Sequence, residues 1–206
     1  MALAGVWSVA IAVGAIGVMH VIPPSSALNP LQRTISEYAL LTDGWVFDAG
    51  VMTLAAGSGA VIFALVFQHI LPLRSWAALF LSTWCIGLVG LVLFPKHGFG
   101  ADTTIAGRVH WTWTLLAFFS LPIGTAMLVR IKRVDLGLFR WPVWANRLSL
   151  IAGGWFVVLA GQTVVSVVDP AGMWPIVGLV ERGLSLTEMV TVWVLARWAL
   201  ARLSLE

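Results

Sequence analysis

One connection of this chain gathers ionisable side chains between two long apolar stretches. The segment FPKHGFGADTTIAGRVHWTW, residues 94–113, holds two histidines, an aspartate, a lysine and an arginine, although only 10% of the chain is charged. Among these groups, His97, Asp102, Arg108 and His110 are of the types that transfer protons, bind polar ligands or hold metal ions. The segment therefore indicates either a polar site or merely a solvent-exposed connection between two helices.

Carboxyl groups at or inside the apolar stretches point to the same kind of site. Glu188 lies well inside the last stretch and Asp48 just inside the second. Ionisable groups within a membrane span are costly, and they mark functional sites by default. We expect four groups, each near the outer end of a different element, to surround one outward-facing cavity as its catalytic acid–base residues. They are Glu188, Asp48, Glu37 and His110.

Together these groups suit an enzyme that acts on an amphiphilic lipid or an isoprenoid without a cofactor. A carboxylic acid that burial keeps neutral can donate a proton, and a histidine can hold or replenish it. Tryptophan faces can stabilise a carbocation, so the predicted reaction is an acid-initiated cyclisation or isomerisation of a polyprenyl chain, as in membrane terpene cyclases. The chain has no aspartate pair and no DxDD motif. The side chains predicted to contact the substrate are Trp113, Trp155, Trp193, Tyr38, Gln162, Arg108, His97 and Asp102.

Metal-dependent lipid hydrolysis is a second hypothesis. His20, His97 and His110, together with Asp102 or Glu37, supply enough ligand types for a three-ligand zinc site with an open position. The spacing argues against such a site, because the chain has no HExxH or HxxxH motif and no two histidines four residues apart. We therefore assign no metal ligand.

The same residues also fit a protein that catalyses nothing. A lipid-binding protein or an accessory subunit would use the polar groups to hold a head group or a partner. In a purely structural alternative, Glu188 or Asp48 pairs with Arg108, Arg182 or a histidine and so holds the bundle together. All of these hypotheses place the polar groups at one end of the molecule, and the oligomeric state stays open.

The elements that must position these groups are six apolar stretches, each close to the length of about 20 residues that a bilayer requires. The chain is 60% hydrophobic. In hydrocarbon the backbone must satisfy its own polar groups, which a helix does. The sequence therefore predicts an all-α integral-membrane protein, a bundle of six transmembrane helices in a single domain, residues 1–206. The predicted spans are residues 3–22, 45–68, 76–95, 109–129, 148–168 and 183–203.

The distribution of basic residues predicts the orientation of the bundle. Basic side chains accumulate on the cytoplasmic side of membrane proteins. We therefore expect a multi-pass protein of the bacterial inner membrane with both termini cytoplasmic. The basic connection, residues 130–147, is expected to touch anionic lipid head groups, and no nucleic-acid partner is expected. The lysines and arginines that do not fall on the predicted cytoplasmic side are Arg33, Lys96, Arg108 and Arg182.

The first outer connection, residues 23–44, is the longest. Two prolines break the first helix, and Asn29 and Pro30 are typical of the N-cap and first position of a short helix. Apolar and polar residues then alternate at helical spacing, which predicts a short amphipathic segment. Such a segment either lies in the membrane interface or folds over the bundle as a lid.

Several short motifs resemble a known family. They are the proline after the first helix followed by NPLQRTISEYAL, the FP that closes the third helix, the GRVHW that opens the fourth, and the GLVERG before the sixth. The chain resembles the bacterial six-helix membrane proteins grouped as domain of unknown function 998, which are distantly similar to the DRAM-like six-helix family. The resemblance covers essentially the whole chain. The resemblance implies the fold and the membrane location. It implies no activity and identifies no functional residues.

Overall fold

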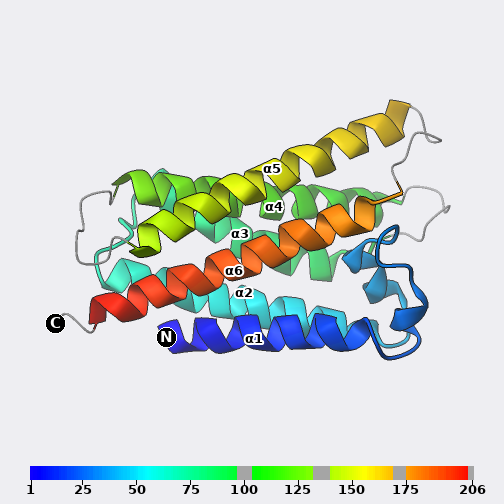
Figure 1. Cartoon of the computed structure of the whole chain (residues 1–206), viewed down its shortest axis with the longest axis horizontal. Coiled ribbons are helices and arrows are strands. Elements are labelled where there is room, and N and C mark those ends of the chain that lie inside the picture. The colour runs from blue at the N-terminus through cyan, green and yellow to red at the C-terminus, as the bar shows by residue number, and fades with distance from the viewer. Residues whose placement is uncertain (97–103, 132–139, 169–174, 204–206) are drawn as a thin grey trace.

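Six long helices make up nearly all of the computed structural model, which describes residues 1–96, 104–131, 140–168 and 175–203. All six are long and apolar enough to cross a membrane. The described residues contain no strand, so the predicted all-α bundle of six transmembrane helices is confirmed. The helices are α1 (Ala2–Met19), α2 (Gly44–Phe67), α3 (Trp76–Leu93), α4 (Ile105–Ile131), α5 (Arg140–Val168) and α6 (Val177–Leu203), as Figure 1 shows.

The last two helices begin earlier than their apolar stretches predict. The expected starts were residues 148 and 183, whereas α5 begins at Arg140 and α6 at Val177. Hydropathy marks only the part of a helix that faces lipid or core. Helical hydrogen bonding continues through polar residues such as Asn146, Arg147 and Arg182 without interruption.

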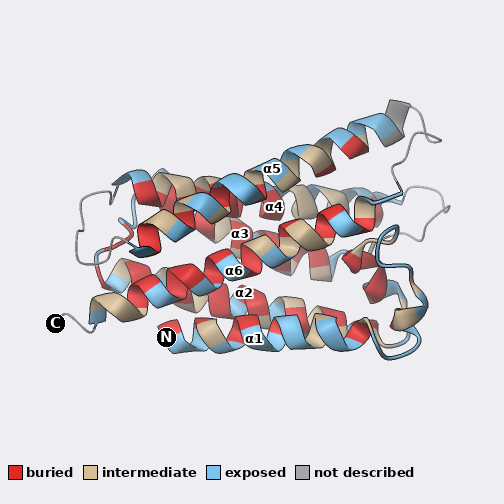
Figure 2. Cartoon of the chain, viewed as in Figure 1, coloured by how far each residue is buried: buried red, intermediate tan, exposed pale blue. Residues whose placement is uncertain are grey.

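The helices close into a ring with α6 nearest its centre. Each helix packs against the next one in the chain, and α6 packs back against α1. Helix α6 also contacts α2 and α4, so it touches four of the other five helices. In its most apolar window 56% of the residues are buried, against 22% for α5, and Figure 2 shows this difference along the two helices. Side chains on α6 are therefore well placed to face cavities inside the bundle.

The two ends of the bundle differ in what covers them. The beginning of α1 and the end of α6 lie at one end (Figure 1). At the other end, residues 20–43, which we call the cap, join α1 to α2, and we call this the cap end. The ends of α1, α3 and α5 and the beginnings of α2, α4 and α6 lie there. Six helices that can each cross a membrane support a multi-pass arrangement, while the cytoplasmic location of the termini stays a prediction.

Inside the cap, the predicted helix at Asn29 and Pro30 was wrong. The side-chain oxygen of Asn29 accepts a hydrogen bond from the Leu31 N–H at 3.0 Å, and its backbone oxygen accepts from the Arg33 N–H at 2.9 Å, so Asn29 caps a single turn that does not continue as a helix. The cap contains two short 3₁₀ helices, η1 (Ser25–Ala27) before this turn and η2 (Ile35–Leu40) after it. Helix η2 packs on α2 and α6, and Ile35 through Tyr38 are buried. The amphipathic segment thus folds over the bundle and does not lie flat beside it.

Side-specific labelling of two single cysteines tests this arrangement. Leu31 in the cap is 48% exposed and Leu73, in the turn between α2 and α3, is 71% exposed. With Cys85 replaced by serine, Leu31→Cys and Leu73→Cys should react with a membrane-impermeant maleimide from opposite sides of the membrane. The predicted orientation requires Leu73→Cys to react only in inverted vesicles. Reaction of both cysteines from one side would contradict the six-span arrangement itself.

Candidate functional site

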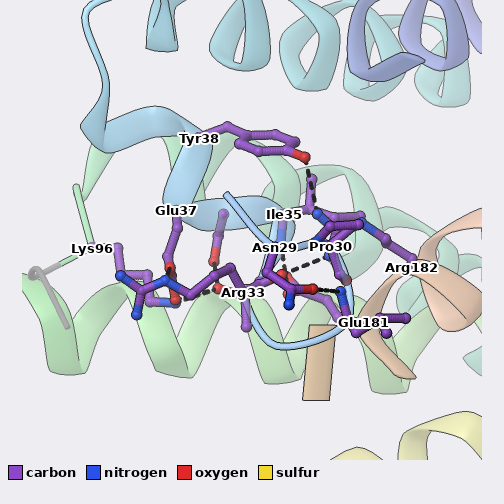
Figure 3. Close-up of polar contacts among 12 residues, drawn as sticks. Asn29, Pro30, Arg33, Ile35, Glu37, Tyr38, Lys96, Glu181 and Arg182 are labelled. Atoms are coloured by element: carbon purple, nitrogen blue, oxygen red, sulfur yellow. Dashed lines mark hydrogen bonds and ion pairs between the residues drawn. The ribbon is translucent and has the colours of Figure 1, made fainter. Parts of the chain in front are cut away.

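The guanidinium of Arg182, in the second turn of α6, fastens the cap to the bundle. Its Nε donates to His20 Nε2 at 2.8 Å, and its second terminal nitrogen donates to the Tyr38 hydroxyl at 3.0 Å. The first terminal nitrogen is within hydrogen-bond distance of three backbone oxygens. They belong to Pro30 (2.7 Å), Arg33 (2.6 Å) and Gly178 (3.0 Å). Figure 3 shows Arg182 reaching from α6 into the cap.

His20 and Gly178 make this fastening possible. The Nδ1 of His20 lies 2.7 Å from the Ile16 carbonyl oxygen, which can only accept, so Nδ1 carries the proton and Nε2 is free to accept from Arg182. At position 178 a side chain would collide with the cap, because a Cβ there would lie 2.3 Å from the Arg33 carbonyl oxygen. Glycine lets the two cap carbonyls approach α6 closely enough to reach the guanidinium.

Two carboxylates also hold the cap, one next to Arg182 on α6 and one on η2. Glu181 is 5% exposed, and its Oε2 accepts a hydrogen bond from the Ile35 N–H at 2.9 Å. Glu37, which lies on η2, is paired with Arg33 at 3.1 Å and with Lys96 at 3.4 Å. The Lys96 ammonium also donates to the Thr34 hydroxyl at 2.5 Å. Lys96 follows α3, so these contacts tie η2 to a third part of the bundle (Figure 3).

A polar cavity of about 170 Å³ lies directly under these contacts. It lies where the cap meets α4, α5 and α6, and in Figure 1 α5 and α6 diverge toward this end. About 10–15 Å³ on this measure is enough for one water molecule, so the cavity has room for a head group of several atoms. Its polar lining comes from Gln32, Thr34, Ser36, Glu37, Lys96, His110, Thr114, Gln162, Thr163 and Glu181, and its other walls from Trp111, Leu115, Phe118, Leu159 and Val177.

A second, smaller cavity of about 70 Å³ lies beside it, among the helices of the bundle. Its walls come from α1, α2, α3, α4, α6 and η2, and almost all of them are apolar, including Phe47, Leu54, Trp84 and Leu88. Four residues line both cavities, so the two spaces lie side by side there. The four shared residues are Ser36, Thr114, Phe118 and Glu181.

The predicted catalytic residues divide between this site and other places. Glu37 and His110 both line the polar cavity. Glu188 is completely buried on α6, and neither of its carboxyl oxygens has a hydrogen-bond partner within the described residues. Asp48 is half-buried near the start of α2. Neither Glu188 nor Asp48 is among the residues that line the two cavities.

The residues predicted to contact a substrate also divide. Gln162 lines the polar cavity, whereas Tyr38 sits above it in the cap, bonded to Arg182. None of the three predicted tryptophans is among the lining residues of either cavity. Trp113 packs over Gly90, Trp155 packs over Gly183, and Trp193 stacks edge-on against Trp141. Tryptophans that do line the cavities are Trp84 and Trp111.

The remaining predicted residues come from the connection between α3 and α4. Arg108 is exposed at the start of α4. His97 and Asp102 lie outside the described residues. Within the described part of the chain, no group of three or more His, Cys, Asp or Glu side chains is arranged to hold a metal ion. The metal hypothesis depends on His97 or Asp102 and gains no support from His20, whose Nε2 accepts from Arg182.

Sequence reasoning missed the part that Glu181, Arg182 and Lys96 play at this site. A signal for Glu181 was present, because it lies seven residues before Glu188 and so shares its helix face. Side chains on a helix lean toward its N-terminus, which for α6 is the cap end. Glu181 therefore reaches the cap, whereas Glu188 lies about two turns deeper.

Comparison with known proteins assigns the chain to a family. The sequence profile of a family described as Protein of unknown function (DUF998) matches residues 3–198. The chain belongs to this family. No curated protein and no solved structure matches the chain. The motifs by which the chain resembles the DUF998 family meet in the cap and the polar cavity: TISE contributes Thr34, Ser36 and Glu37, GRVHW contributes His110 and Trp111, and GLVERG contributes Glu181 and Arg182.

Replacing Arg182 with methionine should release the cap while leaving the six helices in place. The variant removes the hydrogen bonds to His20, Tyr38 and the cap carbonyls, and each buried group left unpaired costs about 1–3 kcal/mol. We expect faster hydrogen exchange confined to residues 20–43 and a lower melting temperature. Arg108→Met, which removes an exposed cation at the same end, is the matched control and should change neither. Unchanged exchange in the cap of Arg182→Met would contradict the fastening role.

Proposed function

We propose that this membrane protein binds an amphiphile, a lipid or an isoprenoid, at its cap end. The proposal rests on one observation: a polar cavity adjoins an apolar one, and Ser36, Thr114, Phe118 and Glu181 line both. A molecule with a polar head and an apolar tail matches this pair of spaces, whereas a wholly polar or wholly apolar ligand would match only one of them. The head would occupy the polar cavity, and the first carbons of the tail would enter the bundle.

The position of the site in the fold supports the same proposal. Small-molecule sites in helical bundles lie between the helices, in concave and mostly apolar spaces with a few placed polar groups. The polar cavity lies where α5 and α6 diverge, and α5 is the least buried of the six helices. An amphiphile that leaves the surrounding lipid layer would therefore meet the cavity without first passing through water. The cap would cover its head group.

Blocking the junction between the two cavities tests the proposal. Thr114 lines both cavities, and its hydroxyl bonds to the His110 carbonyl oxygen at 2.9 Å. Thr114→Phe should fill the junction and expel two or three methylenes of the tail, which corresponds to a loss of affinity of about tenfold or more. Native mass spectrometry of the solubilised protein with four amphiphiles of one chain length would measure retention: monoolein, oleate, oleylamine and methyl oleate.

The matched control lies on the same helix. Thr112 makes the equivalent bond to the Arg108 carbonyl oxygen at 3.0 Å but is exposed, so Thr112→Phe should leave retention unchanged. Ser36→Leu, at the same junction, provides a second obstruction if Thr114→Phe folds poorly. Retention of none of the four amphiphiles by the unaltered protein would refute the proposed function.

Acid–base chemistry on the bound head group is a second candidate function. Glu181 and His110 line the same polar cavity. The Nδ1 of His110 lies 2.9 Å from the Leu91 carbonyl oxygen and 2.8 Å from that of Phe94, so it carries a proton, and Nε2 of the neutral ring can accept one. The pair that we propose for proton transfer is thus Glu181 and His110, with Glu37 held in its ion pairs and Glu188 outside the cavity lining.

The bound lipids of two variants distinguish catalysis from binding alone. If the site is catalytic, His110→Gln should keep the fold but accumulate substrate, so the copurified amphiphile should differ in mass from that of the unaltered protein. His69→Gln removes a histidine from the turn after α2, at the opposite end of the bundle, and should change nothing. The same amphiphile in all three proteins would favour a binding role without catalysis.

A further inference from the structure

Gln162 on α5 is a buried amide with unmet hydrogen-bonding capacity inside the polar cavity. It is 3% exposed and lines the cavity, yet neither its Oε1 nor its Nε2 has a partner within the described residues. Buried polar groups are almost always hydrogen-bonded in native proteins. An exception that borders a polar cavity points to a partner in that cavity, either ordered water or a ligand.

The amide restricts what that partner can be. Gln162 offers one acceptor and two donors a few ångströms apart. A hydroxyl group both donates and accepts, so it can satisfy either end of the amide, and a head with two hydroxyls can satisfy both. A carboxylate or phosphate only accepts, and an ammonium only donates, so each would leave one end of Gln162 unpaired.

Charge around the cavity argues in the same direction. The described lining residues include one lysine and two glutamates, so their formal charge is negative. The lysine, Lys96, already bonds Thr34 and Glu37. Arg182 is not a lining residue, and its nitrogens are directed to His20, Tyr38 and backbone oxygens. An anionic head group would therefore face carboxylates, and the cation among the described lining residues, Lys96, is already paired.

We propose that the amphiphile carries a neutral, hydroxylated head group and that Gln162 recognises this head group by hydrogen bonding to its hydroxyls. This inference rests on the proposed function, because it names the head group of the ligand that the two cavities hold. Gln162 pairs with the head-group hydroxyls from α5, while Glu181 on α6 accepts from them on the opposite side. The residue determines which head groups are accepted, and the apolar cavity accepts the tail whatever the head.

Two probes that differ only in their hydroxyls test the role of Gln162. Monoolein and methyl oleate share the same acyl chain and ester, and only monoolein carries the two glycerol hydroxyls. The unaltered protein should retain monoolein about tenfold more strongly than methyl oleate, and Gln162→Met should bring this ratio close to one. Oleate, with its anionic head, should bind more weakly than monoolein to the unaltered protein.

Stability measurements separate ligand recognition from a structural role. Methionine has nearly the same length as glutamine and leaves no unpaired polar atom, so ligand-free Gln162→Met should melt no lower than the unaltered protein. Gln68→Met removes a buried glutamine just beyond α2, at the opposite end, and should leave the monoolein ratio unchanged. Gln162→Leu provides a second substitution if the methionine variant is poorly produced.

Three results would overturn the inference. They are equal retention of monoolein and methyl oleate by the unaltered protein, stronger retention of oleate, and a clear loss of stability in Gln162→Met. In the first two cases an amphiphile is still bound, so the proposed function stands while the head-group assignment fails. Retention of no amphiphile at all would remove both proposals together, and the lone amide would then be satisfied by water.

Discussion

The cap end of this protein depends on one guanidinium. Arg182 is the only described residue whose side chain bonds at once to the end of α1, to the turn at Pro30 and Arg33, and to η2. Arginine suits this position because its rigid fork presents donors in several directions, whereas a lysine ammonium is a single point of charge. Gly178 and Glu181 flank it on the same turns of α6 and bring the cap within reach. The roof of the polar cavity is therefore built from α6 outward.

The bundle itself was predictable because the membrane imposes a simple length rule. Six stretches of about 20 apolar residues are required to become helices, since hydrocarbon offers the backbone no other partner. Where polar residues continue a helix, as at Arg140 and Arg182, hydropathy no longer marks its end, and the predicted starts of α5 and α6 were late. At Asn29 the capping bond forms as the sequence indicates, but the helix stops after a single turn.

The candidate site was less predictable, because a membrane helix is apolar on every side. Lipid and core are both apolar, so the pattern does not reveal which face of α4 or α5 points inward. Trp111 thus lines the polar cavity while Trp113, two residues on, packs over Gly90. The sequence also did not show which of the two α6 carboxyls lies near the cap. Glu181 and Glu188 share a helix face, and the path of the cap determines that Glu181 contacts it. Polar side chains near the outer helix ends were expected to face a common site. Three of these predicted residues do line the polar cavity: Glu37, His110 and Gln162.

The sequence separation of the contacts to Arg182 has a consequence for biosynthesis. Arg182 lies 162 residues after His20 and 149 residues after Arg33, so the first five helices leave the ribosome before the cap has its main donor. During that interval the carbonyls of Pro30 and Arg33 lack the Arg182 donor, and the core lacks the buried face of α6. Insertion of α6 then fills the centre and closes the cap in one step. A chain that stops before α6 would thus leave polar backbone of the cap and part of the core exposed, and such exposed surface favours aggregation or degradation.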